Sequence, residues 1–235
     1  MKLPLRVRCL MVGLLALLAP APASADMLVV VDARGGALQP GQTIDAQTPI
    51  VLQAGQRVTL IAANGATIKL SGPFEGVPDP QSQRAGGVVE SLRKLASQPT
   101  QGTSTLGTVR AATGELPTQP WLIDVRSGGD RCVQQDAPVV FWRPAPKTDQ
   151  TIEISPSDRA WQAQAPWPAG LDQLAMPPNF PAADAQTYII AGPGTSAAIT
   201  LHLIPPALDA DAMRAAWMVE MGCAGQAWLL ARTLR

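Results

Sequence analysis

Apolar and polar residues alternate with a period of two through the segment from Thr48 to Gly76. Three runs carry the alternation, and their apolar positions are Ile50 and Leu52, Val58 and Leu60, and Ile68 and Leu70. This spacing places the apolar side chains on one face of a strand. Gly55 and Asn64-Gly65 lie between the runs, where glycine readily adopts the backbone conformation of a tight turn. The segment therefore predicts short strands joined by tight turns and ended by Gly72-Pro73.

The glycines and aliphatic residues of this segment resemble the strand ladder of FecR-like domains. The matching positions are Gly41-x-x-Ile44, Pro49-Ile50-x-Leu52, Gly55-x-x-Val58-x-Leu60 and Gly65-x-x-Ile68-x-Leu70-x-Gly72-Pro73. The resemblance covers residues 28–76 and implies a compact β region at 26–76, as in bacterial envelope proteins, some of them signal transducers. This chain departs from the transducer pattern, having neither a cytoplasmic segment nor an internal membrane span, so an anti-sigma role is not carried over. The whole chain resembles small secreted bacterial proteins of no assigned activity.

Residues 1–25 have the three parts of an export signal. A basic start (Lys2, Arg6, Arg8) precedes an apolar run, and Ala23-Ser24-Ala25 ends it with the small residues that signal peptidase cleaves after. The apolar run is shorter than the roughly 20 residues that span a bilayer. We expect cleavage after Ala25 and a periplasmic or secreted protein with no membrane span.

The remaining chain carries 15 basic and 18 acidic residues, a net charge of −3. This balance argues against binding to nucleic acid, which requires clustered Lys and Arg. Cleavage would also leave Cys132 and Cys223 as the only cysteines. In an oxidising compartment an even cysteine count favours a disulfide. Two buried free thiols, or a pair of metal ligands, are the alternatives.

The chain after the first β region predicts a connector and a second β region. Residues 77–120 are rich in Pro, Gly, Ser and Thr around one amphipathic helix at 85–97. From Trp121 to the end, residues 121–235, short β-type runs recur with turn residues between them, which predicts a β sandwich or small barrel. After Pro205-Pro206 the spacing becomes helical, with Asp209 as the expected cap and Gly222 as a break between two helical segments. The predicted fold is mainly β, closed by C-terminal helices.

The sequence offers little that indicates chemistry. His202 is the only histidine, and it lies in an alternating run, which favours a half-exposed strand residue over a catalytic base. Metal-ligand spacing, phosphate-binding loops and the G-x-S-x-G motif are absent from the sequence. We therefore expect no catalytic, cofactor or metal site and no cofactor. An envelope hydrolase with paired carboxylates is the less favoured alternative.

The tryptophans give the remaining functional candidates. Most of them are expected in the core, but Trp161 and Trp167 lie in the proline-rich stretch "DRAWQAQAPWPAG", which predicts exposed rings that could bind a ligand. The leading hypothesis is a non-catalytic exported protein that binds another envelope protein as a scaffold or accessory component. A carbohydrate- or peptidoglycan-binding module, with Trp161 or Trp167 lining a groove, is the alternative.

Overall fold

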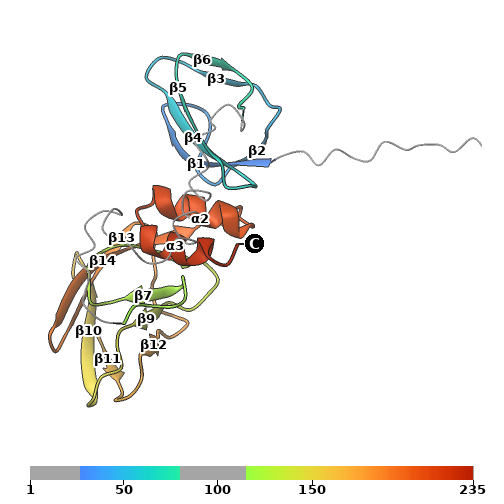
Figure 1. The fold of residues 1–235 in the computed structure, drawn as a ribbon. Coiled ribbons are helices and arrows are strands. Elements are labelled where there is room, and N and C mark those ends of the chain that lie inside the picture. The colour runs from blue at the N-terminus through green and yellow to red at the C-terminus, as the bar shows by residue number, and fades with distance from the viewer. Residues whose placement is uncertain (1–26, 80–114, 235) are drawn as a thin grey trace, which may run out of the picture.

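The computed structural model describes residues 27–79 and 115–234 of the 235-residue chain. The expected export signal and the expected helix at 85–97 lie outside the described residues. Figure 1 shows two β units at opposite ends of the molecule with a pair of helices between them. The prediction of a mainly β fold closed by C-terminal helices is confirmed.

The N-terminal β unit comprises six strands in two sheets. The strands are β1 (Met27–Arg34), β2 (Thr43–Asp45), β3 (Ile50–Leu52), β4 (Arg57–Ala62), β5 (Thr67–Ser71) and β6 (Phe74–Gly76). A four-stranded sheet has the order β2-β1-β4-β5, and β3 pairs with β6. Side chains of both sheets share one core. The three predicted runs are strands β3, β4 and β5, and the turn between β4 and β5 contains Gly65 at φ 80°.

The second β unit is a sandwich of a five-stranded and a three-stranded sheet. Its strands are β7 (Leu122–Asp124), β8 (Gly129–Gln134), β9 (Val140–Trp142), β10 (Gln150–Pro156), β11 (Ala163–Trp167), β12 (Gln173–Ala175), β13 (Gln186–Gly192) and β14 (Thr195–Ile204). The sheet orders are β11-β10-β13-β14-β8 and β12-β9-β7. Residues of both sheets form a single core around Phe141, Trp167 and Ile199. The predicted sandwich is therefore present, and its two sheets do not join into a barrel.

The edge strands of the five-stranded sheet differ in how they end the hydrogen-bond ladder. β11 carries Pro166, which has no N–H to donate to a further strand. At the other edge, β8 runs parallel to β14. The Cys132 N–H of β8 donates to Gln226 Oε1 at 2.8 Å, and Gln226 Nε2 donates to the Cys132 carbonyl at 2.8 Å. The Gln226 side-chain amide thus replaces the next strand at this position.

Helices α2 (Asp211–Glu220) and α3 (Ala224–Ala231) form the helix pair. The residue that caps α2 is Ala210, not the predicted Asp209, and no side chain caps the helix. Gly222 separates the helices as expected: at φ 82° it ends α2 in a Schellman motif, with Cys223 N–H bonded to Met218 O and Gly222 N–H bonded to Val219 O. This tight turn folds α3 back against α2.

The helix pair packs against both β units. One core cluster contains Val29, Val31 and Ile61 of the N-terminal sheet together with Trp217 and the two cysteines. Strand β1 is therefore buried on both faces, since Leu28 and Val30 point into the other core. A continuous apolar run is typical of a strand covered on both sides, and "LVVV" at 28–31 is such a run. Lys69 and Glu220 add an ion pair of 2.7 Å across this contact.

Replacing Gln226 with Met tests the role of its amide in joining the helices to the sandwich. The variant keeps the side-chain volume but leaves three buried backbone groups without partners: the Cys132 N–H and C=O and the Pro120 C=O, which accepts from Nε2 at 2.7 Å. We expect the free energy of unfolding to fall by about 2 to 5 kcal/mol in urea titrations followed by circular dichroism. The exposed Gln173→Met control should stay within about 0.5 kcal/mol of wild type. A Gln226→Met value as small as the control would contradict this role.

Candidate functional site

Cys132 and Cys223 form a disulfide, as predicted, across a sequence separation of 91 residues and a Cα–Cα distance of 5.9 Å. Both cysteines are buried. The bond joins edge strand β8 to the residue that precedes α3, one turn away from the Gln226 amide. Its position therefore makes it part of the attachment of the helix pair to the sandwich.

Trp167 is not the exposed ring that the sequence predicts. It is fully buried at the end of strand β11, opposite Gln150 of β10, where the sequence indicated a loop. Its indole N–H donates to the Leu171 carbonyl at 2.7 Å, and the Arg143 guanidinium stacks over the ring at 4.4 Å from the centroid. The strand was missed because "AQAPW" contains no β-branched residue and includes a proline.

Trp161 is half-buried and belongs to an aromatic cluster at the other end of the sandwich. Its ring lies 6.2 Å from those of Phe180 and Tyr188. Burial raises the pKa of Tyr188, whose hydroxyl accepts the Ala183 N–H at 3.1 Å. The structure therefore does not bring Trp161 and Trp167 together. The other four tryptophans, Trp121, Trp142, Trp217 and Trp228, are buried or partly buried, as expected for most of them.

His202 has a partner that the sequence did not indicate. Its Nε2 lies 2.8 Å from Asp130 Oδ1, because the parallel pairing of β14 with β8 brings together residues 72 positions apart. Local spacing carries no signal for such a contact. Asp130 also packs against Gly222, where an added Cβ would lie 2.9 Å from Oδ2. The pair therefore supports the turn between α2 and α3.

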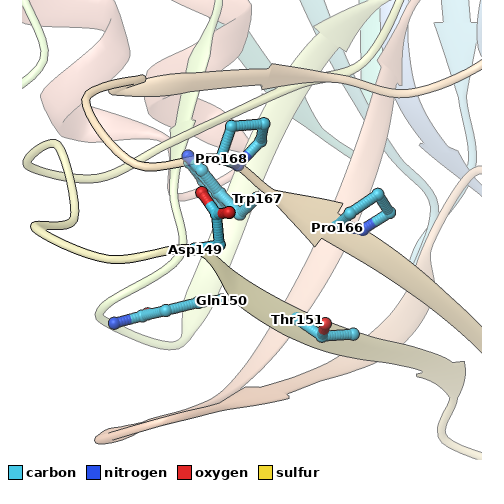
Figure 2. A pocket seen from close by; sticks show the side chains of 6 residues that line it. All are labelled: Asp149, Gln150, Thr151, Pro166, Trp167 and Pro168. Carbon is cyan, nitrogen blue, oxygen red and sulfur yellow. The ribbon is translucent and has the colours of Figure 1, made fainter.

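A shallow hollow of about 270 Å³ lies at the other edge of the five-stranded sheet (Figure 2). Its lining comes from the start of β10 and the end of β11: Asp149, Gln150, Thr151, Pro166, Trp167 and Pro168. Asp149 Oδ1 accepts the Ala169 N–H at 2.8 Å, which fixes the carboxylate at the rim. The hollow thus combines an apolar wall with a carboxylate, an amide and a hydroxyl.

The outer face of the β3–β6 sheet exposes apolar side chains. Val51 is 65 % exposed, and Val77, which follows β6, is 44 % exposed. Glu75 pairs with Val51 across the two strands and is exposed as well. In Figure 1 this sheet lies on the side of the N-terminal unit away from the helix pair. We call Val51, Glu75 and Val77 the β3–β6 face.

Within 27–79 and 115–234, no three His, Cys, Asp or Glu side chains gather in an arrangement that could hold a metal ion. The same residues include no helix that is long and apolar enough to cross a bilayer. Comparison of the chain with known protein families, with curated proteins and with solved structures finds no match.

Gly222 and Gly225 form a matched pair for testing the turn beside Asp130. Gly222→Ala forces alanine into positive φ and a contact with the Asp130 carboxylate, so we expect a loss of about 1 to 3 kcal/mol in unfolding free energy. Gly225 lies in α3 with nothing near an added Cβ, so Gly225→Ala should gain up to about 1 kcal/mol. Thermal and urea unfolding measure both, and equal effects would refute the proposed role of Gly222.

Proposed function

We propose that this chain is an exported, non-catalytic envelope protein that binds another protein through the β3–β6 face. The main supporting observation is the exposure of Val51, on a sheet that the helix pair does not cover, and of Val77, directly after that sheet. Exposed apolar side chains grouped on one face are typical of interaction sites. The export signal at 1–25 and the resemblance of residues 28–76 to FecR-like domains support the location in the envelope.

The chemistry of this face indicates the kind of partner. Glu75 lies directly across from Val51 and two residues before Val77, so a negative charge accompanies the two apolar groups. A complementary partner presents aliphatic or aromatic side chains with a Lys or Arg opposite Glu75. The small apolar area favours a transient contact over a permanent one.

The alternative of a glycan-binding module receives less support. It relies on tryptophan rings exposed as stacking surfaces, and Trp167 is buried while Trp161 packs edge-on against Phe180. Its remaining prediction is retention on cell wall through Trp161, which the following experiment includes as a separate measurement.

A photo-crosslinking residue, p-benzoylphenylalanine, placed at position 51 in the exporting cell tests the proposed function. We expect one dominant protein adduct. Glu75→Lys reverses the charge and should lower the adduct yield about twofold to fivefold, the effect of losing an exposed ion pair. The same residue at position 171, where the wild-type Leu171 is 50 % exposed in the sandwich, serves as the matched control and should not give that adduct.

Equal adducts from positions 51 and 171 would refute the β3–β6 face as the docking site. Retention of the purified protein on protein-free cell wall, lost on Trp161→Ala, would replace protein binding with the glycan-binding alternative. The Trp161→Ala variant must first show a wild-type circular dichroism spectrum, because the ring packs against Phe180 and Tyr188.

A further inference from the structure

Two arginine side chains face each other on the N-terminal four-stranded sheet. Arg34, at the end of β1, pairs directly with Arg57, at the start of β4. The neighbouring pair, Ala33 and Val58, packs in the core of the N-terminal unit, so the two arginines project from the opposite face of the sheet. Residues directly opposite each other on antiparallel strands have Cβ atoms about 5 Å apart. Both arginines are exposed, so a molecule in solution can reach both guanidiniums.

A β-bulge in β1 places Arg34 on this face. The register between β1 and β4 shifts between Val30 and Asp32, so Val31 is an extra residue in β1. In an uninterrupted ladder the alternation of the strand would turn Arg34 toward the core instead. Bulges re-aim side chains in this way, and they are common next to functional sites. The arginine pair therefore depends on a defined irregularity of the strand.

The side chain of Gln56 holds the backbone beside the arginine pair. Its Nε2 donates to the carbonyl of Gly35, which directly follows Arg34, and its Oε1 accepts the Gln53 N–H at 2.8 Å. Gln56 itself directly precedes Arg57. The two strand ends that carry the arginines are therefore tied together. Binding between them would cost less ordering of the chain than binding between two free loops.

The two arginines have no counter-ion in the described part of the chain. Neither forms an ion pair there, whereas Lys69, on the same face of the sheet, pairs with Glu220. Asp32 also lies on this face, opposite Thr59, but makes no ion pair with either arginine. Like charges directly opposite each other destabilise a pair of strands. An anion bound between the two guanidiniums would remove this repulsion.

We propose that Arg34 and Arg57 bind a phosphomonoester group between them. Each guanidinium offers paired N–H donors that match phosphate oxygens. A phosphomonoester carries close to two negative charges and three acceptor oxygens, so it matches two arginines, whereas a phosphodiester or a carboxylate carries one charge. Ser71 pairs with Arg57 across the β4–β5 ladder and brings a hydroxyl to the same face. The phosphate belongs to a lipid headgroup or to a soluble molecule, and the site is separate from the β3–β6 face.

Titration of the whole chain with glycerol 3-phosphate, followed by NMR, tests the site directly. The reporters are the Nε–H signals of Arg34 and Arg57. At a pH of about 7.5 the ester is a dianion, because its second pKa is about 6, and we expect saturable shifts with a Kd of about 1 to 10 mM. Dimethyl phosphate, a monoanion, should bind at least about fivefold more weakly at the same ionic strength. Absence of a saturable shift up to about 50 mM glycerol 3-phosphate, or equal affinity for the two esters, would overturn the proposal.

Four variants assign the contacts. Arg34→Gln and Arg57→Gln should each weaken glycerol 3-phosphate binding about fivefold or more. Asp32→Asn removes the carboxylate from the same face and should strengthen binding about twofold. Arg159→Gln is the matched control, since it removes an equally exposed arginine from the sandwich, and it should bind like wild type. Wild-type affinity in both Arg34→Gln and Arg57→Gln, or an equal loss in Arg159→Gln, would overturn the proposal.

Vesicle sedimentation identifies the source of the phosphate group. Phosphatidylcholine vesicles that contain phosphatidic acid, a phosphomonoester, are compared with vesicles that contain phosphatidylglycerol, a phosphodiester. Stronger sedimentation of the protein with phosphatidic acid, lost in Arg57→Gln, would assign the site to a lipid headgroup. Binding of glycerol 3-phosphate without sedimentation would assign it to a soluble phosphomonoester.

Discussion

The attachment of the helix pair to strand β8 determines how the rest of the molecule is arranged. Backbone groups buried at a sheet edge need partners, and the amide of Gln226 supplies one donor and one acceptor in the geometry of a neighbouring strand. The Cys132–Cys223 bond holds the residue that precedes the same helix, one turn away from Gln226. With α3 fixed there, the Schellman turn at Gly222 directs α2 back across it. The remaining apolar face of the pair then becomes the surface on which the N-terminal sheet packs.

In this arrangement, the side chains that join the sheets to the helices differ from those that are exposed for binding. The cysteines, most of the tryptophans and the His202–Asp130 pair contribute to the joints between sheets and helices. The β3–β6 face takes no part in these joints, since Val51 and Glu75 are exposed and the helix pair does not cover them. This face lies on the side of the N-terminal unit away from the helix pair (Figure 1). A protein bound to this face would therefore touch none of the residues that join the sheets to the helices.

The sequence predicted local features well and long-range ones poorly. Strands β3 to β5 followed from period-two alternation, and the break at Gly222 from the glycine within a helical pattern. The disulfide was predictable because the expected cleavage after Ala25 would leave two cysteines and so one pairing. The burial of Trp167 was not, because it depends on Arg143 and Gln150 approaching from other strands. The partner of His202 likewise depends on a parallel pairing 72 residues apart. Contacts between distant segments leave no repeating pattern in a single sequence from which they could be predicted.

The two edges of the five-stranded sheet affect how readily copies of this protein associate. Exposed strand edges recruit further strands from other molecules and so promote aggregation. Here Pro166 removes a donor from β11, and Gln226 occupies the polar groups of Cys132 on β8. Copies of this protein therefore have little opportunity to join through this sheet edge to edge. The same residues that complete the fold also keep neighbouring molecules apart.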